Sequence, residues 1–118
     1  MRIRKRIPDL RLIAILATLL AVLTPSIGNA DDNVAGQQIY QQNCVGCHGS
    51  DGSGNMRGIP DLTASDSPLK KPEAELVNNV INGVYRSMFG MPPRGGNSSL
   101  SDQDIVEVVR YMKATFTR

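Results

Sequence analysis

Residues 44–48 read Cys44-Val45-Gly46-Cys47-His48: two cysteines three positions apart, with a histidine directly after the second. This spacing is the attachment signature of a covalently bound c-type haem. Cysteines at i and i+3 lie on one helical turn, so both thiols can form thioethers with vinyl groups of one porphyrin. The next imidazole is then presented to the iron as its proximal ligand. The run predicts one haem c held by Cys44 and Cys47, with His48 on the iron.

Three other interpretations of this run remain open on the sequence alone. A disulfide oxidoreductase places its C-x-x-C after a strand, but no strand-like alternation precedes Cys44. A structural zinc site needs four ligands, whereas the chain has two cysteines and one histidine. A plain disulfide would close a very short loop and leave His48 without a role. Haem attachment uses all three side chains and is therefore favoured.

The N-terminal segment has the organisation of an export signal. Five basic residues and one acidic residue are followed by an apolar run of 12 residues, Leu12 to Leu23, and by small residues ending at Ala30. The run is shorter than the roughly 17–25 residues of a membrane span, so it fits a cleaved signal better than an anchor. We predict a cleaved Sec-type signal peptide at residues 1–30, one domain at residues 31–118, and a periplasmic location. Membrane anchoring through an uncleaved segment is the alternative.

Cleavage would also reverse the charge balance. The precursor has 13 basic and 11 acidic side chains, and loss of residues 1–30 leaves eight basic and ten acidic ones. The basic balance of the precursor therefore does not indicate nucleic-acid binding, and no nucleic-acid motif is present. With only three tyrosines and two phenylalanines, a domain this small is marginal without a stabilising group. We expect the haem to form the centre of the core.

An all-α fold is predicted, with three main helices and irregular loops around the haem. The first helix spans about residues 34–47, where Gly36, Tyr40 and Cys44 recur every four residues and share one face. The second spans about residues 72–82, with Pro72 near its first position and Gly83 as its stop.

The last helix has the most complete signals. Ser101 can cap it and Asp104 occupies the third position of a capping box. Apolar residues then recur at i, i+3, i+4 and i+7, namely Ile105, Val108, Val109 and Met112. We interpret this stripe as core packing rather than as a cofactor-binding feature.

Together these residues resemble the class I (mitochondrial-type) cytochromes c over essentially all of residues 33–118. The resemblance rests on Gly36-x3-Tyr40-x3-Cys44-x2-Cys47-His48, Ile59-Pro60-Asp61-Leu62, Gly90-Met91-Pro92-Pro93 and a final helix ending near Tyr111. Met91 to Asn97, followed by Leu100 to Asp102, is similar to the small bacterial monohaem cytochromes c of the c-five type. Some members of that group carry a cysteine pair that this chain lacks. The resemblance implies that the first and last helices cross near Gly36 and Tyr111.

The same resemblance implies roles for two residues beyond the motif. In the class, a proline about this far past the histidine accepts a hydrogen bond from the proximal imidazole through its carbonyl. Pro60 would thus orient His48, and Leu62 would pack on the haem. Without the resemblance, Pro60 is an ordinary loop proline.

The second axial ligand separates a carrier from an enzyme. His48 is the only histidine, so methionine is the natural remaining candidate. Met88 and Met91 both follow the second predicted helix and both are candidates, whereas Met56 lies on the proximal side and Met112 in the apolar stripe. The proline after Met91 biases its backbone toward an extended conformation, and the resemblance implies Met91 as the ligand.

An iron with two protein ligands has no vacant position for a small-molecule substrate. We therefore expect a periplasmic one-electron carrier, not an enzyme, that docks transiently as a monomer with a redox protein donor and acceptor. Two alternatives stay open: a cytochrome subunit of a larger oxidoreductase complex, and a ligand-binding or peroxidase-like haem protein.

Overall fold

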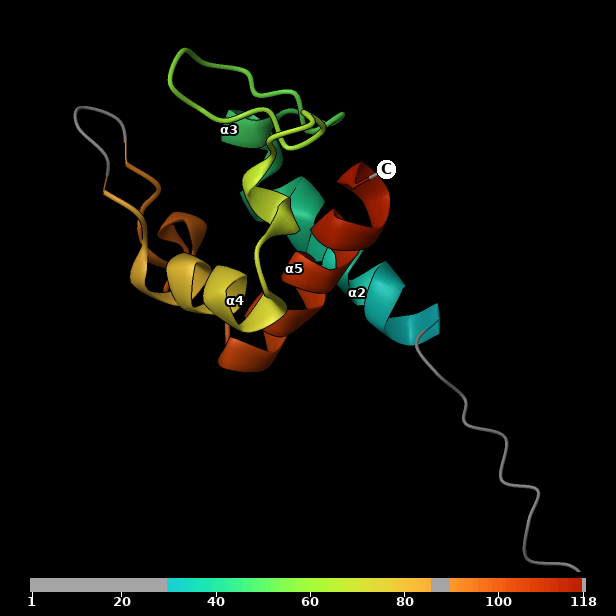
Figure 1. Ribbon diagram of the computed structural model, residues 1–118. Helices are drawn as coiled ribbons and strands as arrows, with labels where there is room; N and C mark the ends of the chain where they lie inside the picture. The colour runs from blue at the N-terminus through green and yellow to red at the C-terminus, as the bar shows by residue number, and fades with distance from the viewer. Residues whose placement is uncertain (1–29, 86–89, 118) are drawn as a thin grey trace, which may run out of the picture.

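The computed structural model describes residues 30–85 and 90–117. Within these ranges it contains helices and a single isolated bridge but no strand, which confirms the predicted all-α fold (Figure 1). The α-helices are α2 (Ala30–Asn43), α3 (Val45–His48), α4 (Glu73–Asn82) and α5 (Asp102–Phe116), and the 3-10 helices are η1 (Pro68–Lys70) and η2 (Pro93–Gly96). The predicted signal peptide, apart from Ala30, and the candidate ligand Met88 lie outside the described residues.

Helices α2 and α5 cross in close contact (Figure 1). A β-carbon at Gly36 would lie 2.4 Å from the carbonyl oxygen of Glu107 and 2.7 Å from Cβ of Tyr111. Only glycine lets two helix backbones approach this closely, so its presence in a helix, which costs about 1 kcal/mol against alanine, has a packing reason. The implied crossing near Gly36 and Tyr111 is confirmed.

Three aromatic rings fill the same crossing. The ring centroid of Tyr40 is 5.6 Å from that of Tyr111 and 5.2 Å from that of Phe116. The Tyr40 hydroxyl donates a 2.7 Å hydrogen bond to the carbonyl of Gly49, and burial raises the pKa of this phenol. Because Phe116 is buried against Tyr40, α5 continues to this residue, and the expected end near Tyr111 was wrong.

The first predicted helix is interrupted where the cysteine motif begins. α2 ends at Asn43, Cys44 forms a turn with φ −114°, and α3 begins at Val45. The amide of Cys44 still donates to Tyr40, and its carbonyl accepts from the amide of His48. The motif therefore occupies a separate short helix, so the prediction of one continuous helix was wrong at its C-terminal end.

The other helix boundaries follow their sequence signals. α4 begins at Glu73, with Pro72 at the N-cap rather than inside the helix, and Gly83 follows its last residue with φ +76°. At the start of α5, the Ser101 hydroxyl accepts from the amide of Asp104, and the Asp104 carboxylate accepts from the amide of Ser101. The predicted capping box is confirmed.

No helix within the described ranges is both long enough and apolar enough to cross a membrane.

Candidate functional site

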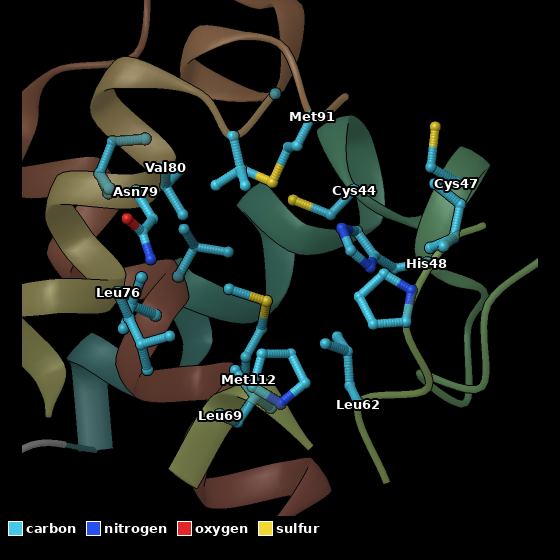
Figure 2. A pocket seen from close by; sticks show the side chains of 18 of the residues that line it. Cys44, Cys47, His48, Leu62, Leu69, Leu76, Asn79, Val80, Met91 and Met112 are labelled. Atoms are coloured by element: carbon cyan, nitrogen blue, oxygen red, sulfur yellow. The ribbon is translucent and has the colours of Figure 1, made fainter. Parts of the chain in front are cut away.

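A cavity of about 460 Å³ lies among α3, α4, α5 and η2 (Figure 2). Its volume falls in the range of roughly 300–1,000 Å³ that is typical of ligand sites. All the site residues predicted from the sequence line it, namely Cys44, Cys47, His48, Pro60, Leu62 and Met91. Residues from both halves of the chain therefore line one cavity.

The walls of the cavity are mostly apolar. α4 contributes Leu76 and Val80, and the segment before α4 contributes Leu62 and Leu69 (Figure 2). The stripe of α5 forms a further wall, through Ile105, Val108, Val109 and Met112. These four residues belong to the buried core, as predicted, and in addition they face the cavity, which the sequence interpretation did not include. Helical periodicity identifies a buried face but not what covers it.

His48 is the last residue of α3 and its ring is partly buried. Burial lowers the pKa of the imidazole, which favours the neutral ring with a lone pair free to bind a metal. Among the described residues, its Nδ1 atom is the one buried side-chain nitrogen or oxygen without a hydrogen-bond partner. The implied hydrogen bond from Nδ1 to the Pro60 carbonyl is therefore not formed, although Pro60 lines the same cavity.

The two cysteines are free thiols, with Cys44 partly buried and Cys47 exposed. Burial raises the pKa of the Cys44 thiol to about 11, which is the opposite of the lowered pKa that activates a disulfide oxidoreductase. Across residues 30–85 and 90–117, no group of three His, Cys, Asp or Glu side chains is placed to hold a metal ion. The apolar cavity beside both thiols and the unpartnered imidazole fits a porphyrin better than it fits zinc or a redox disulfide.

Met91 lines the cavity and its backbone is fixed to the end of α4. Its amide donates to the carbonyl of Val84 at 2.8 Å, and its carbonyl accepts from the amide of Val84 at 2.9 Å. A β-carbon at Gly83 would lie 2.7 Å from the Met91 carbonyl, so this bridge also depends on a glycine. Met112 lines the cavity too, whereas Met56 is 52% exposed and is not among the lining residues.

Sequence reasoning missed the polar part of the wall. Asn43, Asp66, Lys71, Asn79 and Arg94 all line the cavity. Lys71 also forms an ion pair with Glu75 at 2.5 Å. No spacing rule singles out these residues, because they come from four separate segments that only the tertiary fold brings together.

This fold and this cavity define a class of protein: a small helical domain built around one covalently bound c-type haem. The observations that fit the haem are the paired thiols on one turn, the unpartnered imidazole and the apolar walls.

Comparison with known proteins gives the family. A family model described as "Cytochrome C oxidase, cbb3-type, subunit III" matches residues 31–112, which is more than half of the chain. The chain therefore belongs to this family of cytochrome c domains. Its cofactor is a covalently bound c-type haem, and its function is electron transfer.

Individual relatives support the same assignment. Cytochrome c6 of Picosynechococcus sp. is 34% identical over 107 residues, covering 85% of this chain and 86% of the relative. Cytochrome c6 of Gracilaria tenuistipitata var. liui is 34% identical over 83 residues, covering 70% of this chain and 72% of the relative. The predicted resemblance to small monohaem class I cytochromes is confirmed.

A second kind of relative is longer. The thiosulfate dehydrogenase of Stutzerimonas stutzeri is 34% identical over 87 residues, which cover 70% of this chain but only 27% of that protein. The likeness to this enzyme is thus confined to one part of it.

Proposed function

We propose that the chain is a periplasmic one-electron carrier whose haem is attached through Cys44 and Cys47 and ligated by His48 and Met91. The observation that carries the proposal is the gathering of these four residues on one mostly apolar cavity. Bound haem supplies reversible one-electron chemistry. Cys44 and Cys47 would attach it in a site of low polarity, and His48 and Met91 would ligate its iron.

The choice of Met91 over Met112 is supported by how each residue is held. Met91 lies in an extended segment, bridged to Val84, whose backbone is fixed while its side chain reaches the cavity. Met112 lies on α5 among buried apolar side chains, with 8% exposure. A His/Met pair raises the reduction potential and leaves no open position for a substrate.

Residues 1–30 are proposed to act as a cleaved Sec-type signal peptide. The charged start, the apolar run and the small residues before Asp31 support this. The mature domain would begin at Asp31 and work in the periplasm as a monomer that docks transiently with a redox protein donor and acceptor.

A second candidate function is a cytochrome subunit of a larger oxidoreductase. The description of the family, as a subunit of an oxidase, and the thiosulfate dehydrogenase relative favour it. Purification of the untagged native protein under mild conditions separates the two. A stoichiometric partner that persists through size-exclusion chromatography supports the subunit, and a protein that elutes at its monomer size supports the free carrier.

Optical spectra of two methionine variants test the ligand assignment. Met91→Ala removes the proposed sulfur ligand, so the ferric protein should lose its sulfur-to-iron charge-transfer absorption and its reduction potential should fall. Met112→Leu is the matched control, because Met112 is the other described methionine that lines the cavity and leucine replaces it at nearly constant volume. It should keep both the absorption and the potential. The reverse pattern would assign the ligand to Met112, and loss in neither variant would direct attention to Met88.

A further inference from the structure

The segment that follows Met91 contains a sharp change of backbone direction at residues 94–96. We call this the reversal. In η2, Arg94 has φ +55° and Gly95 has φ +62°, and Gly96 follows with φ +86°. Arg94 is the only residue other than glycine with positive φ in the described part of the chain. Glycine adopts this conformation freely, whereas a β-carbon is disfavoured in it. An arginine persists in such a conformation only where contacts with the surrounding structure stabilise it, so the contacts of the Arg94 side chain are of interest.

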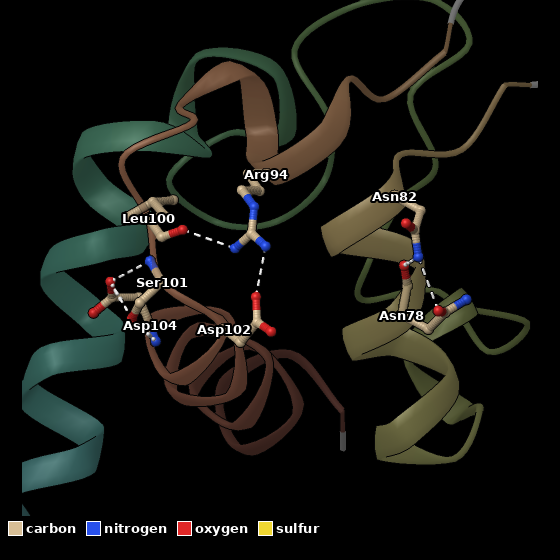
Figure 3. A network of polar contacts seen from close by, with 7 residues as sticks. All are labelled: Asn78, Asn82, Arg94, Leu100, Ser101, Asp102 and Asp104. Carbon is tan, nitrogen blue, oxygen red and sulfur yellow. Dashed lines mark hydrogen bonds and ion pairs between the residues drawn. The ribbon is translucent and has the colours of Figure 1, made fainter.

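The guanidinium of Arg94 connects the reversal to the start of α5 (Figure 3). Nη1 donates to the carbonyl of Leu100 at 2.7 Å, and Nη2 donates to the carboxylate of Asp102 at 2.5 Å. Only 24% of the arginine side chain is exposed. Both terminal nitrogens therefore donate to protein acceptors, one just before α5 and one on its first residue, although Arg94 also lines the cavity.

The C-terminal end of the reversal contacts the residue that directly precedes the cysteine motif. The side-chain amide of Asn97 donates to the side-chain oxygen of Asn43 at 2.9 Å. Asn43 is the last residue of α2, directly before Cys44, and its own amide donates to the carbonyl of Ile39. The segment after Met91 thus has one attachment on α5 and one beside the haem attachment residues.

We propose that Arg94 is a positioning residue for Met91. The Met91 segment is held upstream by the bridge to Val84 and downstream by the two hydrogen bonds of Arg94. Without the hydrogen bonds of Arg94, the downstream side would keep only the attachment of Asn97 to Asn43, and the segment carrying Met91 would move away from the cavity more readily. This inference rests on the proposed function, in which Met91 is the axial ligand.

The rate at which imidazole displaces the methionine from ferric, full-chain holoprotein tests the inference. At saturating imidazole this rate is limited by departure of the sulfur, and it is followed by loss of the charge-transfer absorption. Arg94→Gly removes the side chain while relieving the backbone, so the variant should fold. Loss of two hydrogen bonds from a charged donor should speed displacement about tenfold. Arg94→Ala, which keeps the unfavourable backbone, should be faster still.

Two further variants distinguish the two hydrogen bonds of Arg94 from its positive charge and from a general loosening of α5. Arg94→Lys keeps the charge but cannot reproduce the fork of two hydrogen bonds, so its displacement should remain faster than that of the wild type. Arg110→Ala is the matched control: this arginine pairs with Glu73 at 3.0 Å, joins α5 to α4 away from the cavity, and should leave the rate unchanged.

An unchanged or slower rate in Arg94→Gly would overturn the inference, as would a wild-type rate in Arg94→Lys. If Met91 is not the ligand, a different result reveals it: the Met91→Ala variant would keep the sulfur-to-iron charge-transfer absorption. The two failures are therefore distinguishable.

Discussion

The crossing of α2 and α5 and the cavity beside α4 are two halves of one small core, and they are completed differently. At the crossing, Gly36 brings the helix backbones into contact, and the rings of Tyr40, Tyr111 and Phe116 pack on one another. On the other side of α5, mostly apolar side chains face a cavity of about 460 Å³. The polypeptide completes the first half, and the haem is required to complete the second.

The largest expected effect is the loss of folding without the cofactor. A chain with Cys44→Ala and Cys47→Ala, produced without haem attachment, should show no cooperative thermal transition by circular dichroism. A haem that binds the native state and not the unfolded state supplies much of the stability. The packing at the crossing of α2 and α5 is too small a core to replace that contribution. A sharp transition in this apo chain would mean that the cavity half folds without haem, which would contradict the difference drawn between the two halves.

A substitution at the crossing should be costly for the opposite reason, because that half has no space. In Gly36→Ala holoprotein, the new β-carbon would overlap the Glu107 carbonyl and Cβ of Tyr111, so the free energy of unfolding should fall by about 2 kcal/mol. Denaturant titration measures it. Gly46→Ala is a suitable control, since nothing lies within 4 Å of a β-carbon there. Equal stability of the two variants would show that the helices separate easily.

A smaller effect is expected where the two halves meet. The Tyr40 hydroxyl on α2 donates to the carbonyl of Gly49, which directly follows His48. Tyr40→Phe keeps the aromatic packing but leaves this carbonyl with only the longer, 3.3 Å hydrogen bond from the amide of Gly52, which should lower the free energy of unfolding by about 1 kcal/mol. The same denaturant titration measures the change. A neutral effect would indicate that the crossing and the segment that follows His48 are not coupled through this bond.

Local signals in the sequence predicted the crossing half better than the cavity half. The Gly36, Tyr40, Cys44 spacing and the capping box at Ser101 each depend on residues within one helix or its ends. Both correspond to features of the structure.

The cavity half depends on contacts between distant segments, so less of it was predictable. Periodicity showed that α5 has an apolar face but not that this face lines the cavity opposite Leu76 and Val80 of α4. The left-handed backbone of Arg94 was also hidden, because the neighbouring glycines alone account for a turn. The six site residues were found through the motif and the family resemblance, which encode long-range placement that propensities do not.

The central claim is that both axial positions of the iron are taken by side chains of this chain, which makes the protein a carrier rather than a ligand-binding haem protein. Exposure of the reduced, full-chain holoprotein to carbon monoxide at neutral pH tests it most directly. We expect an unchanged absorption spectrum, because His48 and Met91 leave no open position. Rapid formation of a carbon monoxide complex by the native protein would contradict the claim and would favour the ligand-binding or peroxidase-like alternative.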